Sequence, residues 1–306
     1  MPNGAVLMID SSSRSAATLG ICLMLLAVLL FSMNDALGKW LVSTYAVAQL
    51  LLIRSLAALV VLAPMVMSAG WRTLFAIDRP WLMALRCLFT TLEVASFYFA
   101  VVYMPLADAI TFWMAAPIYV AALSPLLLGE HVGWRRWTAI GIGFVGVLIA
   151  LQPSAATLTL PALIALGGSL LFALMMLTGR ALRGTPDLAL VFWPTAAAGL
   201  FGALLAPANW ISPSVGDLLM LVLLGVVALA AHWATNRSLK LADAATVTPY
   251  QYTLLVWAII FGWLFFSETP RLSMLIGAGV IVASGLYIFF REQQLGRRAG
   301  IPAVEK

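Results

Sequence analysis

Charged residues are scarce in this chain. Of its 306 residues, 9% are charged and 63% are hydrophobic, whereas about 25% of the residues of an ordinary soluble domain are charged. The 17 basic and 12 acidic side chains cannot cover the surface of a soluble protein of this length. The composition therefore excludes a soluble globular fold and indicates a membrane protein.

Cysteine and histidine are nearly absent. The two cysteines, Cys22 and Cys87, each lie in an apolar run and there are only two histidines, so we expect no zinc cluster and no disulfide. The chain contains no HExxH, no GxSxG and no GxxxxGK[ST] motif. We therefore expect no catalytic site, no metal, no cofactor and no ATP hydrolysis within the chain.

Long apolar runs separate the few charged segments. Each run has about twenty residues, enough to cross about 30 Å of hydrocarbon as a helix, and none shows the alternation of a membrane β-barrel. We predict an all-α integral membrane protein with ten transmembrane helices, at 18–41, 46–68, 81–103, 107–128, 137–152, 160–179, 188–206, 217–239, 244–266 and 273–290.

The basic residues orient these helices. With a cytoplasmic N-terminus and ten spans, only Lys39 and Arg271 lie on the outer side and Arg54 lies within a span, while every other basic residue is cytoplasmic. This asymmetry is the one that sets topology during insertion. The net charge of +5 is therefore a topology signal, and we expect lipid contacts but no nucleic-acid partner. Both termini are predicted to be cytoplasmic.

A short motif occurs twice. The letters LADA stand at Leu106–Ala109 and again at Leu241–Ala244. The first copy is followed by Glu130 in LLLGEH and the second by Glu268 in LFFSET, and each half ends in a glycine-rich helix. Further upstream, FSMNDALGKWL and FALMMLTGRAL share Phe, Gly followed by a base, and Leu. The shared order indicates a duplicated five-helix unit.

Five is an odd number, so the second unit must enter the membrane from the opposite side. Inverted repeats of this kind offer inward-open and outward-open arrangements and recur in secondary transporters. The predicted organisation is an N-terminal tail (1–17), a first repeat (18–152), a second repeat (153–290) and a C-terminal tail (291–306).

The two LADA-then-acid units and their glycine-rich last helices resemble the drug/metabolite transporter superfamily, and within it the paired EamA-domain branch. The resemblance covers about residues 18 to 290. It implies ten helices with both ends cytoplasmic, a central cavity lined by the first four helices of each half, and a bacterial inner-membrane location. It also implies transport of small metabolites, as in amino-acid exporters of the YddG type and in vitamin and nucleotide-sugar carriers.

Ionisable groups deep in hydrocarbon need a partner or a water-filled cavity. Asp35, Arg54 and Glu93 lie at similar depths, roughly 9 to 15 Å from the outer ends of their helices at 1.5 Å per residue. They could form one polar cluster with Asn34 beside it, and Lys39 could pair with Asp35 at i, i+4. Two interpretations stay open: an Arg54–Glu93 pair that holds two helices together, or a Glu93 that binds a substrate amine or a proton.

The repeated acids follow short connections. Asp108 and Asp243 stand near helix starts, so we expect each to cap exposed backbone amides, with a gate contact as the alternative. Glu130 and Glu268 are expected at the membrane interface.

Two prolines indicate where helices break near the cavity. Pro117 and Pro249 each remove a backbone donor, which a membrane tolerates where protein or water satisfies the freed carbonyl. The polar and aromatic residues that could line a cavity beside these breaks, together with Asn34 and Glu93, are Trp113, His232, Trp233, Tyr250, Gln251 and Trp257. The alternative for the tryptophans and tyrosines is the interfacial aromatic belt.

Small residues mark the two last helices of the halves. Small side chains allow close helix contact, so these helices are expected to pack against the rest or to form a weak dimer. They carry Gly141, Gly143, Gly146, Gly277, Gly279 and Gly285.

The sequence predicts a secondary transporter that works by alternating access, most simply an exporter of amino acids with aromatic or apolar side chains. The alternative is a carrier of a vitamin or nucleotide-like metabolite with the same fold. A membrane enzyme lacks its motifs here, and a channel usually has rings of repeated groups. Direction of flux and the choice between proton exchange and facilitated diffusion stay open.

Overall fold

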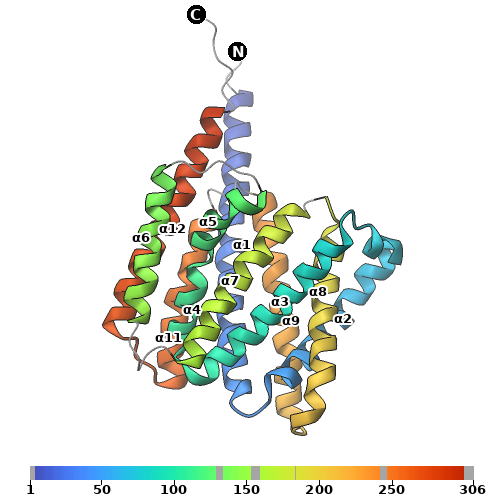
Figure 1. The fold of residues 1–306 in the computed structure, drawn as a ribbon. Coiled ribbons are helices and arrows are strands. Elements are labelled where there is room, and N and C mark those ends of the chain that lie inside the picture. The colour runs from blue at the N-terminus through green and yellow to red at the C-terminus, as the bar shows by residue number, and fades with distance from the viewer. Residues whose placement is uncertain (1–3, 129–133, 153–158, 183, 242–246, 300–306) are drawn as a thin grey trace, which may run out of the picture.

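In the computed structural model the chain is a bundle of helices (Figure 1). The structure describes residues 4–128, 134–152, 159–182, 184–241 and 247–299. Its elements are α1 (Gly4–Val42), α2 (Val47–Ala69), η1 (Trp71–Phe75), α3 (Pro80–Tyr103), α4 (Leu106–Met114), α5 (Ala116–Leu128), α6 (Trp134–Leu151), α7 (Leu160–Ala181), α8 (Asp187–Leu205), η2 (Ala206–Asn209), α9 (Val215–Leu241), η3 (Thr248–Tyr252), α11 (Thr253–Phe266) and α12 (Leu272–Ala299).

Helices suit the apolar runs, since a helix satisfies its own backbone hydrogen bonds where no water is present. Among the described residues, eight helices are long and apolar enough to cross a membrane. Two further apolar helices, at Trp137–Ala150 and Tyr250–Phe266, are shorter. They fall in the fifth and ninth predicted spans. The all-helical membrane class is confirmed, and the count of ten spans stays a prediction.

The fourth predicted span is interrupted. α4 ends at Met114 and α5 begins at Ala116, with a turn at Ala115. Pro117 lies in the first turn of α5, where its missing N–H costs no helical bond of its own, and it cannot extend α4 through the junction. The break therefore stands where the proline predicted it. Pro249 lies in the 3₁₀ helix η3 that leads into α11.

Helices of the two halves pack against each other in pairs. α1 packs along α9, α3 along α7, α2 along α8, α6 along α12, and α4 against α11. By the order of the predicted spans, the counterparts in the two halves are α1 and α7, α2 and α8, α3 and α9, α4 and α11, and α6 and α12. Replacing each helix by its counterpart turns the α1–α9 pair into the α7–α3 pair and leaves the other three pairs unchanged. The pairing scheme is therefore symmetric between the halves. The inverted membrane topology itself, with its repeat boundaries, stays a prediction.

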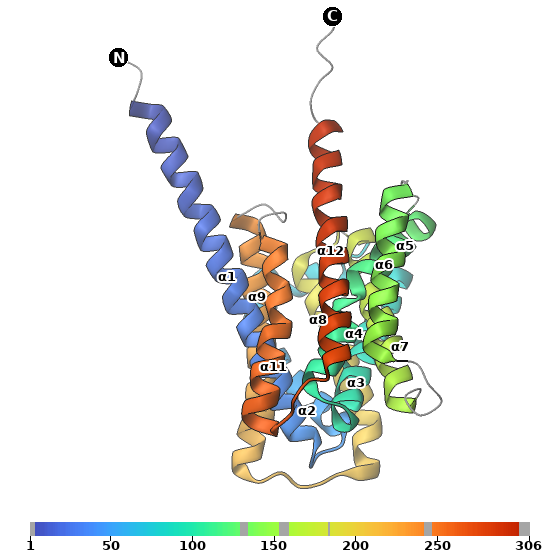
Figure 2. The same ribbon diagram turned by 90° about the vertical axis from the view of Figure 1, so that its left-hand side faces the viewer.

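The start of α1 and the end of α12 point away from the same end of the bundle (Figures 1 and 2). The connections α1–α2, α8–α9 and α11–α12 lie at the opposite end (Figure 2). We call this opposite end the outer end, because the distribution of basic residues predicts that it faces outward.

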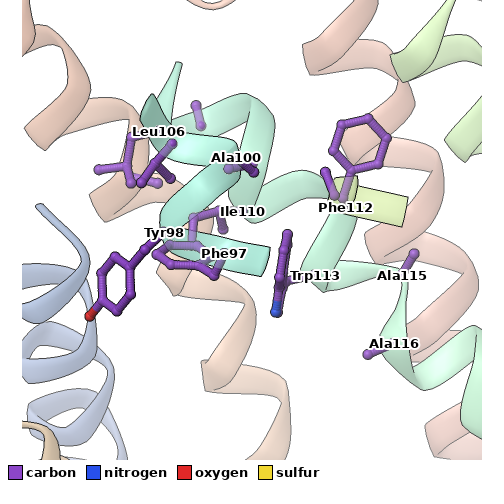
Figure 3. Packing of buried hydrophobic residues seen from close by; sticks show 14 of the residues in the cluster. Phe97, Tyr98, Ala100, Leu106, Ile110, Phe112, Trp113, Ala115 and Ala116 are labelled. Atoms are coloured by element: carbon purple, nitrogen blue, oxygen red, sulfur yellow. The ribbon is translucent and has the colours of Figure 1, made fainter. Parts of the chain in front are cut away.

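The main core lies where α3 and α4 meet the other half (Figure 3). Phe97 and Trp113 pack edge to face, with ring centroids 5.1 Å apart. Tyr98 is 1% exposed, and its hydroxyl points toward α1 (Figure 3). This core holds the candidate site described next.

Candidate functional site

Four helices are joined by one chain of hydrogen bonds in the middle of the bundle. Arg54 on α2 donates from Nη1 to the Tyr98 hydroxyl on α3 at 2.9 Å. That hydroxyl donates to Asn34 Oδ1 on α1 at 3.2 Å, and Asn34 Nδ2 donates to the Leu224 carbonyl on α9 at 2.6 Å. The chain joins α2, α3, α1 and α9, so three helices of the first half are tied to one of the second.

Close backbone packing allows these bonds to form. The ring of Tyr98 occupies the space that a side chain at Gly38 would need, and the backbone of Arg54 occupies the space beside Gly225. The guanidinium of Arg54 also lies over the Tyr98 ring, 5.5 Å from its centroid. The two glycines thus let α1 and α9 approach α3 and α2 at the level of the polar groups.

Glu93 has a separate partner. The indole N–H of Trp113 donates to Glu93 Oε1 at 2.6 Å, and the two side chains are 8% and 6% exposed. Gly168 on α7 leaves room for the indole, because a Cβ there would lie 2.7 Å from Trp113 Cη2. Trp113 therefore fixes the position of Glu93 between α3, α4 and α7.

The predicted cluster assembles, but with other pairings than those expected. Arg54 and Glu93 are both described residues, and no ion pair joins them, so an Arg54–Glu93 pair does not hold helices α2 and α3 together in this structure. Asp35, next to Asn34 on α1, is partly exposed. Lys39 does not pair with Asp35, because its ammonium contacts Glu268 Oε1 on the α11–α12 connection.

The expected capping role of Asp108 is also wrong in its detail. Pro105 is the N-cap of α4, with no side-chain cap, and the free amide of Leu106 donates to Glu268 Oε2 at 2.8 Å. Asp108 accepts from Arg271 Nη2 at 3.1 Å. The acid that caps α4 therefore comes from the other half of the chain. Asp243 and Glu130 lie outside the described residues.

The second-half residues lie against α1. Tyr250 and Trp257 are partly buried and pack on the cluster formed by Met24, Val28 and Val247, and Gln251 is partly buried beside them. The side chain of His232 is exposed, yet its ring meets Phe31 edge to face at 5.0 Å.

Trp233 stands apart from these residues. It is 61% exposed on α9, and among the described residues no bond ties it to the cluster. Whether it or any other of these side chains touches substrate stays a prediction.

Sequence reasoning missed Tyr98, Gly38 and Gly225. A tyrosine in an apolar helix reads as interfacial or core, and only the three-dimensional packing shows its hydroxyl between Arg54 and Asn34. In the sequence, only the predicted depth of Asn34, next to Asp35, indicated a polar cluster in which the Tyr98 hydroxyl could find a partner.

A groove of about 410 Å³ lies elsewhere, between α6 and α12, and includes none of the predicted site residues. Its lining residues are Trp134, Thr138, Ala139, Ile142, Ala283, Ser284 and Tyr287. We therefore place the candidate site at the central polar cluster, which we define as Asn34, Asp35, Arg54, Glu93, Tyr98 and Trp113.

Known proteins resemble this chain over nearly its full length. It is 25% identical to the "S-adenosylmethionine uptake transporter" of Rickettsia prowazekii (90% of this chain, 94% of that protein). It is 27% identical to the "Riboflavin transporter" of Rhizobium johnstonii (93% and 95%) and 29% identical to that of Vibrio cholerae (81% and 84%). These names do not support the expected likeness to amino-acid exporters of the YddG type.

A solved structure shares the fold. It aligns with a TM-score of 0.61 at 19% identity and covers 94% of this chain and 99% of that chain, which bears on the fold alone. The family model described as "EamA-like transporter family" matches residues 18–152 and 159–290. The relatives named above are transporters and none is named as an enzyme. The chain therefore belongs to the EamA-like transporter family and is a multi-pass membrane transporter of small metabolites.

Proposed function

We propose that this chain carries a vitamin- or nucleoside-like metabolite with a flat, nitrogen-containing ring system. The observation that carries the proposal is the set of relatives named for S-adenosylmethionine uptake and for riboflavin. Both compounds combine a fused heteroaromatic ring with a hydroxylated chain or sugar. Amino-acid export, the main sequence expectation, has no comparable support.

The central polar cluster suits such a substrate. Asp35 is less deeply buried than Asn34, Glu93 and Tyr98 in surface exposure, and in this proposal its carboxyl group binds ring N–H groups or a cationic group of the substrate. Tyr250, Trp257 and His232 supply ring faces and edges around α1. Aromatic walls with a few fixed polar groups are the usual composition of a small-molecule site.

The charge balance of the cluster favours a substrate that is neutral or carries a positive group. Asp35 and Glu93 provide two carboxyl groups and Arg54 provides one guanidinium. Ionised groups at this depth are costly unless they are paired. A positive group of the substrate, or a proton, would offset the second carboxyl. A phosphorylated nucleotide would meet only Arg54 here.

Transport into proteoliposomes tests this proposal directly. We expect saturable uptake of labelled riboflavin or S-adenosylmethionine, and no saturable uptake of phenylalanine or tryptophan. Saturable amino-acid uptake without uptake of either metabolite would overturn the proposal.

Variants locate the site in the same assay. Trp257→Ala and Asp35→Asn should each lower the uptake of the transported metabolite at least about tenfold, the equivalent of about 1.4 kcal/mol. Trp263→Ala, at a position 64% exposed on α11, the same helix as Trp257, serves as the matched control for Trp257→Ala and should leave uptake within about twofold. Equal loss in both tryptophan variants would remove Trp257 from the proposed site.

A further inference from the structure

Two ion pairs join the halves of the chain at the outer end. Lys39, in the last turn of α1, contacts Glu268 Oε1 and donates to the Met104 carbonyl at 2.8 Å. Its ammonium also lies 5.2 Å from the centroid of the Phe266 ring. The second pair joins Asp108 on α4 to Arg271, with 3.1 Å between Oδ2 and Nη2.

Glu268 connects the two pairs. Its Oε1 contacts Lys39, while its Oε2 accepts the backbone amide of Leu106 at 2.8 Å. One carboxylate thus fixes the end of α1 to the start of α4. The left-handed backbone of Ser267, with φ of 55°, turns the chain back after α11, and the amide of Glu268 donates to the Gly262 carbonyl at 3.0 Å.

These contacts are shielded from solvent. The side chains of Lys39, Glu268 and Asp108 are 10%, 19% and 7% exposed, and only Arg271, at 53%, is open. Partly buried pairs are screened by salt much less than exposed pairs are. Losing one partner also leaves the other charge uncompensated. The two pairs are therefore placed to contribute measurably to the stability of this arrangement.

Both pairs cross between the halves. Lys39 and Asp108 belong to the first half, whereas Glu268 and Arg271 belong to the second, so separating the halves at this end must break both. We propose that Lys39, Glu268, Asp108 and Arg271 form an ion-pair latch that holds the outer end closed and opens when the transporter faces outward. The latch requires only that the bundle opens at this end, so it can be tested without knowing the substrate.

Cysteine accessibility tests the latch. In a Cys22→Ala, Cys87→Ala background, Ala36→Cys serves as the reporter, at a position 6% exposed and one turn before Lys39 on α1, and a membrane-impermeant maleimide is added outside right-side-out vesicles. We expect Lys39→Glu and Glu268→Lys each to raise the labelling rate about fivefold, which corresponds to about 1 kcal/mol at 1.4 kcal/mol per tenfold.

Two further variants keep the test decisive. Arg271→Gln removes only the exposed partner of Asp108 and should raise labelling in the same direction, even if a Lys39 variant fails to fold. Arg72→Gln, at an exposed basic residue near the other end of α2, is the control and should change nothing. Unchanged labelling in the folded latch variants would overturn the latch.

Discussion

Tyr98 connects polar groups that the sequence places on separate helices. Its hydroxyl accepts from Arg54 and donates to Asn34, so this one oxygen acts as both acceptor and donor. Because Tyr98 is 1% exposed, water cannot replace a lost bond. The geometry of the whole cluster therefore depends on this hydroxyl.

Tyr98→Phe removes the hydroxyl and keeps the ring against Gly38. Hydrogen bonds between membrane helices average about 0.6 kcal/mol and reach about 1.7, so losing two should lower the free energy of unfolding by about 1–2 kcal/mol. SDS-induced unfolding of the purified protein measures this change. Tyr103→Phe, on the same helix but 63% exposed, is the control and should stay within about 0.5 kcal/mol. Equal midpoints for the two variants would contradict the structural role of the hydroxyl.

Sequence reasoning found which residues form the cluster better than which atoms they bond. Asp35, Arg54 and Glu93 could be grouped because helix rise fixes their depth. Their partners depend on how the helices are rotated about their axes, which depth does not specify. Hence Trp113 contacts Glu93, Tyr98 contacts Arg54, and Lys39 turns toward Glu268.

At the scale of elements, glycines divide into two kinds along α6 and α12. Gly146 and Gly277 face each other, so that a Cβ at position 277 would lie 2.6 Å from the Gly146 carbonyl oxygen and from Ala150 Cβ. A Cβ at Gly141 or Gly279 would meet nothing within 4 Å. The sequence could mark all of these positions as small, but only the packing shows which of them are in contact.

Gly277→Ala should therefore separate α12 from α6. The obstructing atoms include backbone, which cannot move without shifting a helix, and overpacking of this kind costs about 1–3 kcal/mol. SDS unfolding should show this loss for Gly277→Ala. Gly279→Ala on the same helix meets open space and should be neutral or slightly stabilising, because alanine favours a helix over glycine. A loss of the same size in Gly279→Ala would show that helix propensity or lipid contact, not close packing, determines the effect.

Breaks and caps were predictable to different extents. Pro117 predicted the α4–α5 junction because a missing donor acts locally. The cap of α4 could not be assigned in this way, since Glu268 lies far along the chain from Leu106. The local effect of a proline can be predicted from the sequence, whereas a contact between the two halves can be predicted only when the fold is known.

At the scale of the molecule, the positions of the two chain ends bear on the membrane topology. α1 and α12 leave the bundle at the same end (Figure 2), and an even number of spans requires this arrangement. If one of the two shorter apolar helices failed to cross, the chain would have an odd number of spans and its ends would lie on opposite sides. The position of the ends therefore tests whether the number of spans is even, as the count of ten requires.

Epitope tags fused to each end provide this test. The basic residues outside the outer end predict that both ends are cytoplasmic, so protease should remove both tags in inside-out vesicles and neither in right-side-out vesicles. An intact periplasmic marker serves as the control for vesicle orientation. Cleavage of one tag in each preparation would place the ends on opposite sides. The two halves could then not form inverted five-helix units, and alternating access would need a different structural basis.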